Sequence, residues 1–178
     1  MTVKSDTMNA VELGSPQGLG ALWYRMRQCP VAREYMPLVD TDVEGLDRRL
    51  AQASTNFDPS EAKEKYFGVR VVGQWVGLVG CRDVSPMMRY AEVNYMVDAP
   101  YRGCGYATAA VSVLIDQLFS HGFRKLGILV DAGNLASITV ARRNKFTLEG
   151  ILRAHYLIGG EPRDQLVFGR LQPELRIG

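Results

Sequence analysis

The sequence lacks the features that mark membrane, secreted and nucleic-acid-binding proteins. Its net charge is only +2 over 178 residues, which is too small to indicate binding to nucleic acid or to a membrane surface. No apolar run approaches the length of a membrane span. Residues 1–10 have no apolar core, so we expect no secretory signal. The 3 cysteines, Cys29, Cys81 and Cys104, are scattered and odd in number, which indicates a reducing cytoplasm rather than a disulfide framework.

What the chain has is the composition of a globular protein, with 47% apolar and 22% charged residues. A length of 178 residues is typical of one domain with its own core. We therefore expect a single domain over residues 1–178, of which residues 1–9 form a flexible tail. We find no internal repeat and no low-complexity segment.

Apolar periodicity predicts helices alternating with strands. A first helix is expected to begin at Pro16, after Ser15 as its cap, and Thr41 and Glu44 form a capping box for a second. Pro30 and Pro37 bound an expected loop. Further helices are expected at 106–121 and 134–144, and strands at 10–13, 66–72, 75–82, 91–97, 125–130, 146–156 and 164–171. Turns are expected at 73–74 and over 158–162, and the strand–helix–strand order predicts a right-handed crossover.

A glycine turn joins the expected strand 91–97 to the expected helix 106–121. The first amides of a helix have no partner within it, and the helix dipole adds positive charge there. Gly103 and Gly105 allow the main chain to approach a ligand closely. The pattern predicts a phosphate site, and the alternative is an ordinary turn that only begins a helix.

Two common phosphate motifs are excluded here. The turn lacks the lysine of a P-loop and the third glycine of a dinucleotide-binding loop. Residues 102–107 instead resemble the Arg/Gln-x-x-Gly-x-Gly/Ala turn of the GNAT N-acetyltransferase superfamily, with Arg102, Gly105 and Ala107 in the matching places. The resemblance implies that this turn binds the pyrophosphate of acetyl-CoA.

A second stretch, from Asn134 to Gly150, resembles the Asn-x-x-Ser…Phe-x-x-Glu-Gly run of the RimJ/RimL-type branch of that superfamily, especially its ribosomal-protein-serine acetyltransferases. The resemblance covers roughly residues 66–171. It implies an α/β GNAT fold: a mixed, mostly antiparallel central sheet, helices on both faces, and two strands that splay apart at the cofactor site. It implies acetyl-CoA as co-substrate, no metal, and these cofactor-binding residues: Met96, Val97, Asp98, Arg102, Gly103, Cys104, Gly105, Tyr106, Ala107, Thr108, Asn134 and Ser137.

The resemblance also suggests catalytic roles. A backbone N–H near Met96–Asp98 is expected to polarise the acetyl carbonyl. Many relatives protonate the leaving thiolate with a tyrosine that lies 7 residues after the capping asparagine, but Ala141 stands there in this chain. Enzymes of the RimL type use the helix serine instead, which matches Ser137. We expect Ser137 to hydrogen-bond the CoA sulfur, and the alternative is that it only completes the helix N-terminus.

The general base is left open. Tyr156, with His155 beside it, stands where RimL-type enzymes carry a glutamate. Glu92 is the other candidate, on the polar face of its strand, although that position also suits a solvent-facing residue. His155 titrates near neutrality, but a lone histidine more often lies in packing or at the surface.

Charged residues outside these motifs have two interpretations each. Asp40, Asp42, Glu44 and Asp47 either form an acidic rim for a cationic amine or favour a helix start. Arg142, Arg143 and Lys145 either contact an outlying CoA phosphate or stabilise a helix end.

The absence of an obvious strong base favours a protein N-terminal α-amine as acceptor. An α-amine has a pKa of about 7.7–8.0 and is partly neutral at physiological pH, whereas a lysine or polyamine amine is neutral about one time in a thousand. Three alternatives stay open: acetylation of a small amine such as an antibiotic, polyamine or amino acid; a non-catalytic CoA-binding module; and Cys104 as a nucleophile with His121 or His155. The acyl chain length and the oligomeric state are also open, although related enzymes are often homodimers.

Overall fold

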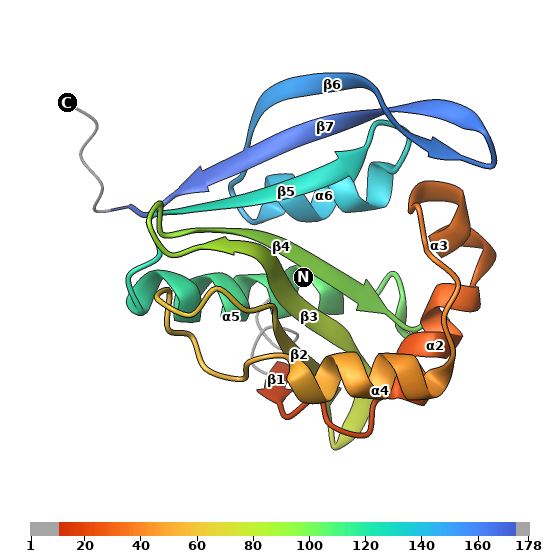
Figure 1. Cartoon of the computed structure of the whole chain (residues 1–178), viewed down its shortest axis with the longest axis horizontal. Coiled ribbons are helices and arrows are strands. Elements are labelled where there is room, and N and C mark those ends of the chain that lie inside the picture. The colour runs from red at the N-terminus through yellow and green to blue at the C-terminus, as the bar shows by residue number, and fades with distance from the viewer. Residues whose placement is uncertain (1–10, 174–178) are drawn as a thin grey trace, which may run out of the picture.

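The computed structural model describes residues 11–173, so the tail expected at residues 1–9 lies outside the described residues. One seven-stranded sheet has the order β1-β2-β3-β4-β5-β7-β6 (Figure 1). Only β4 and β5 pair in parallel, and the other neighbours are antiparallel. This confirms the expected mixed, mostly antiparallel sheet. The strands are β1 (Val11–Gly14), β2 (Lys65–Val71), β3 (Gln74–Ser85), β4 (Tyr90–Val97), β5 (Lys125–Asp131), β6 (Thr147–Ile158) and β7 (Glu161–Leu171).

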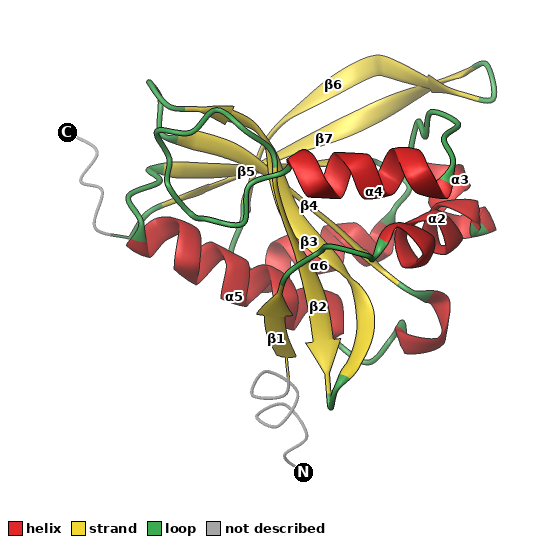
Figure 2. Ribbon diagram, turned by 60° about the horizontal axis from the view of Figure 1, so that its bottom comes forward, coloured by secondary structure: helices red, strands yellow, loops and turns green. Residues whose placement is uncertain are grey.

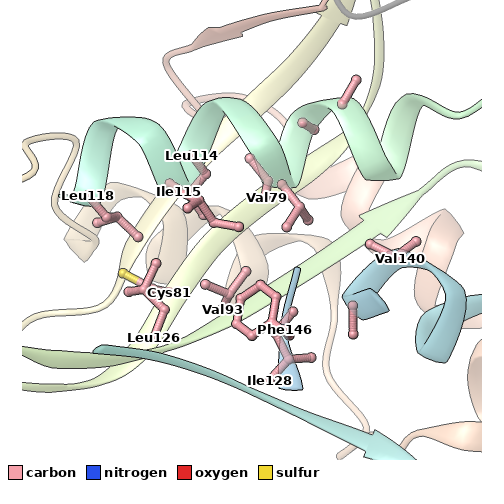
Figure 3. Close-up of a cluster of buried hydrophobic side chains, with 14 of the residues drawn as sticks. Val79, Cys81, Val93, Leu114, Ile115, Leu118, Leu126, Ile128, Val140 and Phe146 are labelled. Atoms are coloured by element: carbon pink, nitrogen blue, oxygen red, sulfur yellow. The ribbon is translucent and has the colours of Figure 1, made fainter. Parts of the chain in front are cut away.

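Helices cover both faces of this sheet, as expected. Side chains alternate along a strand, so Phe67 and Val79 join one apolar cluster while Tyr66 and Leu78 join another. The larger cluster packs under α5 and α6 (Figure 3), and the smaller one packs under α2 and α4. No helix within residues 11–173 is long and apolar enough to cross a bilayer. The helices are α2 (Gly20–Gln28), α3 (Pro30–Tyr35), α4 (Val43–Gln52), the 3-10 turn η1 (Ala99–Tyr101), α5 (Tyr106–Ser120) and α6 (Leu135–Arg143).

The two parallel strands separate soon after they begin. They pair only through Tyr90, Ala91 and Glu92 of β4. Beyond Glu92, β4 follows β3, whereas β5 stays paired with β7 as far as Asp131. Figure 1 shows β4 and β5 diverging toward their carboxyl ends, and Figure 2 shows the β6–β7 hairpin extending away from β1–β4. The expected splayed strand pair is therefore present.

The first three helices differ from the sequence prediction. The helix expected from Pro16 begins at Gly20, because Gly18 has φ +75° and a turn bonds Leu19 N–H to the Pro16 carbonyl at 3.1 Å. The loop expected between Pro30 and Pro37 contains α3, in which Pro30 takes a first-turn position that needs no N–H partner.

The cap of α4 is Asp42 rather than the predicted Thr41. The Asp42 carboxylate accepts a hydrogen bond from the Gly45 amide at 2.6 Å. This is the ordinary geometry of an N-cap aspartate, so the predicted capping box is wrong by one residue.

Both predicted hairpin turns were also misplaced. The β2–β3 turn is Val72-Gly73, with φ +46° and +77°, rather than residues 73–74. The β6–β7 turn is Gly159-Gly160, with φ +58° and +87°, rather than the five residues 158–162. Two successive positive φ angles make the tight turn whose twist matches its strands, so β6 and β7 are longer than predicted.

Candidate active site

A cavity of about 350 Å³ opens where β4 and β5 separate. Its walls come from α3, the carboxyl end of β4, the turn before α5, the first turn of α5 and one side of α6 along its length. Asp98 and Cys104 lie outside this lining. Ten of the residues predicted to bind the cofactor line it: Met96, Val97, Arg102, Gly103, Gly105, Tyr106, Ala107, Thr108, Asn134 and Ser137. The structure thus brings both sequence motifs to one cavity, while the binding role of each residue stays a prediction.

The turn before α5 presents free amides to this cavity. Gly103 and Gly105 have φ +77° and +82°, a backbone conformation that residues with a side chain rarely adopt. Gly105 is the N-cap and offers no side-chain acceptor, and Ala109 is the first amide to bond back, to the Gly105 carbonyl at 3.1 Å. The amides of residues 106–108 therefore have no partner inside the helix and suit an anion.

Arg102 is held in place from two sides. Its Nε donates to the Val97 carbonyl at 2.9 Å, and its Nη1 lies 3.1 Å from the Cys29 sulfur. Burial raises the pKa of Cys29, but Arg102 and the amides of Val31 and Ala32 outweigh it and leave the pKa below its ordinary value. Sequence reasoning missed this contact, because it expected a loop where α3 begins.

The main chain of Val97 faces the gap between the strands. The Asp98 amide donates to the Val76 carbonyl of β3 at 2.9 Å. Backbone groups of successive strand residues point to opposite edges, so the Val97 N–H and carbonyl point away from β3. The bond from Arg102 to the Val97 carbonyl agrees with this direction. Val97 N–H is therefore the amide of the predicted Met96–Asp98 group that fits a donor to an acetyl oxygen.

Asp98 has a structural role on the other side of this strand end. Its carboxylate accepts from the Ala99 amide at 3.0 Å and pairs with Arg25 at 2.6 Å. It caps η1 and is buried, with 4% exposed. These contacts fix the path of the chain from β4 into the glycine turn.

The first turn of α6 closes the opposite wall. The Asn134 carboxamide accepts a hydrogen bond from the Ser137 amide at 3.0 Å, so the predicted cap is confirmed. Ser137 lines the cavity, whereas Ala141, in the place of the missing tyrosine, is fully buried in the core.

The three candidate bases lie outside the cavity lining. Glu92 is 6% exposed, sits at the last paired position of β4 and β5, and accepts from Arg82 Nε at 2.8 Å. Burial raises its pKa above the ordinary value, although Arg82 opposes the rise. Its interpretation as a solvent-facing residue is therefore wrong. His155 is exposed, and the Tyr156 hydroxyl donates to the Asp131 carboxylate at 2.7 Å. Their catalytic roles stay predictions.

Asp131 and Arg163 are site neighbours that sequence reasoning missed. Arg163 binds Asp131 through Nη2 at 2.9 Å and Nε at 3.0 Å, and this joins the β6–β7 hairpin to the end of β5. Burial raises the pKa of Asp131, but the bonds from Arg163 and Tyr156 outweigh it and hold the pKa below its usual value. Burial and Asp131 together raise the pKa of Tyr156. The partners are far apart in sequence, and no local pattern marks them.

The other charged groups mostly take the structural interpretation. Asp42 caps α4, Asp47 accepts from the Gly20 amide at 2.7 Å, and neither lines the cavity. Arg143 does line it, whereas Arg142 and Lys145 do not. The α5 helix, which has 15 residues and is about 22 Å long, separates Cys104 from His121, so His121 cannot act as its base.

Two relatives match part of this chain in sequence. The Escherichia coli K12 spermidine N(1)-acetyltransferase is 30% identical over 107 residues, which are 60% of this chain and 58% of the relative. The ribosomal-protein-serine acetyltransferase of the same strain is 27% identical over 108 residues, 60% of each chain. The matched region thus spans less than two thirds of either relative.

Solved structures and a family model agree with the fold. The structure of RimL, the ribosomal L7/L12 alpha-N-protein acetyltransferase, in complex with coenzyme A has a TM-score of 0.81 and 19% identity, and the match covers 91% of this chain and 94% of RimL. Residues 15–147 match the model of the acetyltransferase (GNAT) domain. The chain therefore belongs to the GNAT family of acetyl-CoA-dependent N-acetyltransferases.

Proposed function

We propose that this protein transfers the acetyl group of acetyl-CoA to the α-amine of a protein N-terminus. The observation that carries the proposal is the composition of the cavity. Its charged lining residues within 11–173 are Arg102 and Arg143, and no carboxylate lines it there. Two arginines suit the phosphates of coenzyme A, whereas a polyamine is a polycation and binds best where carboxylates are free.

Three buried acids near the cavity are already neutralised. Asp98 is paired with Arg25, Asp131 with Arg163, and Glu92 with Arg82. A carboxylate that forms two hydrogen bonds with a guanidinium is a weak base and a weak site for a second cation. An α-amine needs neither a strong base nor a binding site for a cation. Its pKa is about 7.7–8.0, so part of it is already neutral at pH 7.

The proposed reaction uses main-chain groups and one hydroxyl. The amides of the glycine turn hold the pyrophosphate, and Val97 N–H stabilises the charge that grows on the acetyl oxygen. The amine nitrogen bonds to the carbonyl carbon, the C–S bond breaks, and Ser137 stabilises the departing sulfur. The proton lost by the amine ends on the thiolate, which gives the amide and coenzyme A.

Acetylation of a polyamine is the second candidate, because the spermidine acetyltransferase is 30% identical in the matched region. Release of coenzyme A should be measured with a peptide bearing a free N-terminus, the same peptide blocked at the N-terminus but carrying a lysine, spermidine and an aminoglycoside. We expect the free N-terminus to give the highest kcat/KM. A higher value for spermidine overturns the proposal in favour of a small amine, and binding without turnover on any amine leaves a CoA-binding module.

Two further expectations stay predictions, namely a cytoplasmic location and a homodimer. Light scattering during size-exclusion chromatography measures the second.

A further inference from the structure

The hydroxyl of Tyr95 is buried without a partner. Within residues 11–173, only this oxygen and the Asn94 side-chain nitrogen are buried side-chain polar atoms that lack a hydrogen bond. Buried polar groups are almost always paired, so an unpaired phenol needs an explanation. Tyr95 lies on the stretch of β4 that is paired with β3 but no longer with β5, and it lines the cavity, whereas Asn94 does not line it. A molecule bound in the cavity is the partner that explains it.

A neighbouring hydroxyl belongs to Ser137, on the opposite wall of the cavity. Burial raises the pKa of Tyr95 to about 12, and Ser137 is near enough to oppose that rise in part. The two hydroxyls do not reach hydrogen-bond geometry with each other. An atom between them would contact a donor from β4 and a donor from α6.

We propose that Tyr95 is a further catalytic residue, whose hydroxyl donates a hydrogen bond to the sulfur of bound coenzyme A beside Ser137. The proposal rests on the proposed acetyl transfer. The helix position that carries a tyrosine in many relatives is Ala141, which is buried in the core. Tyr95 supplies a phenol from the facing strand instead.

The role of Tyr95 is to stabilise the thiolate, and the proton stays on the phenol. An acid whose pKa is about 12 is too weak to protonate a thiolate whose thiol has a pKa of about 8.5. A hydrogen bond to a charged sulfur is still stronger than one to a neutral thioester. It therefore favours the state in which the C–S bond is breaking.

The test is Tyr95→Phe, which removes the hydroxyl and keeps the ring. Removal of an unpaired buried hydroxyl should leave the free protein at least as stable as wild type. The kcat for acetyl transfer should fall about 10- to 100-fold, while the Kd for acetyl-CoA stays within about 2-fold of wild type. Tyr90→Phe is the matched control, because Tyr90 is on the same strand but outside the cavity lining.

A second readout needs no acceptor amine. The thiolate of bound coenzyme A absorbs in the ultraviolet, and its titration can be isolated by subtracting protein bound to desulfo-coenzyme A. Tyr95→Phe should raise the apparent pKa of the bound thiol by about one, and Tyr90→Phe should not change it. An unchanged thiol pKa together with an unchanged kcat overturns the role. Wild-type protein that binds coenzyme A but acetylates no amine overturns the proposed function alone, because the thiol titration does not depend on turnover.

Discussion

At the scale of single residues, arginines decide the charge of the site. Asp98, Asp131 and Glu92 are buried carboxylates, and each accepts two hydrogen bonds from one guanidinium. These three acids therefore add little free negative charge near the cavity. This pairing makes stability depend on pH in a direction that can be worked out for Asp131.

Replacing Asp131 with asparagine should lower the free energy of unfolding at pH 7. Loss of one partner of a buried ion pair costs about 3–5 kcal/mol, and we expect about 2 kcal/mol here because Arg163 is 31% exposed. The pKa of Asp131 is lower in the folded state, so its contribution is present above pH about 4 and is lost as the pH falls through the folded value.

Urea denaturation at pH 7 and at pH 3 measures this effect. The difference between wild type and Asp131→Asn should shrink at the lower pH. The control is Asp40→Asn. Asp40 is 91% exposed and forms a loose surface ion pair with Arg33 at 3.4 Å, so this variant should change the free energy of unfolding little. A difference for Asp131→Asn that is equal at both pH values would contradict the assignment.

At the scale of elements, the ends of helices carry both stability and binding. The cap of α4 is one case. Asp42→Ala should cost about 0.5–2 kcal/mol in thermal or urea unfolding, whereas Thr41→Ala should be close to neutral, since Asp42 alone bonds the Gly45 amide.

Asp42→Asn serves a second purpose, because it keeps a good cap and removes the charge. If an acidic rim attracted the amine, Asp42→Asn with Glu44→Gln would raise KM for the amine. The structure places neither residue in the cavity lining, so we expect KM to stay unchanged.

The glycine turn before α5 is the second case. Gly105 has φ +82°, so Gly105→Ala forces alanine into a left-handed conformation that costs about 1–2 kcal/mol. We expect the Kd for acetyl-CoA, measured by calorimetry, to rise about tenfold. Gly150→Ala is the control, because its added methyl group meets open space outside the cavity lining. Equal Kd values for the two variants would count against the turn as the anchor.

At the scale of the whole molecule, the motifs in sequence predicted their own local structure better than they predicted the chain that surrounds them. The turn from Arg102 to Ala107 and the cap at Asn134 were correct, because their geometry depends on neighbouring residues. The mixed, mostly antiparallel sheet and the splayed pair followed from the resemblance, whereas the order of the strands in the sheet was not predicted. The sequence does not predict the short helix α3, since its six residues give too short a pattern and a proline can bound a loop as well as begin a helix.

Long-range contacts were beyond sequence reasoning for a physical reason. Asp131 is paired with Arg163 across 32 residues, and Arg102 contacts Cys29 across 73. The fold, rather than any periodicity, brings such pairs together. The unpaired hydroxyl of Tyr95 could not be predicted for the same reason. Alternation along a β-strand predicts the face of the sheet on which Tyr95 lies, but not that its hydroxyl lacks a partner.

Binding of coenzyme A should stabilise the whole fold, mainly through the contact between its pyrophosphate and the glycine turn. At a coenzyme A concentration of 100 times Kd, the gain is about 2.7 kcal/mol, which corresponds to a rise in Tm of about 5–10 °C for a chain of this size. Pantetheine, which lacks the pyrophosphate, should give a much smaller rise at the same concentration. Equal rises for the two ligands would argue against the turn.

The central claim is that the amides of residues 103–108 hold the pyrophosphate of coenzyme A. A chain of 19.8 kDa is small enough for amide-resolved NMR, and a titration with coenzyme A reports on each N–H. We predict that the amides of this turn and of Val97 shift most and in a saturable way, while those of α4 stay in place. Saturable binding that leaves the amides of residues 103–108 unshifted would contradict the account.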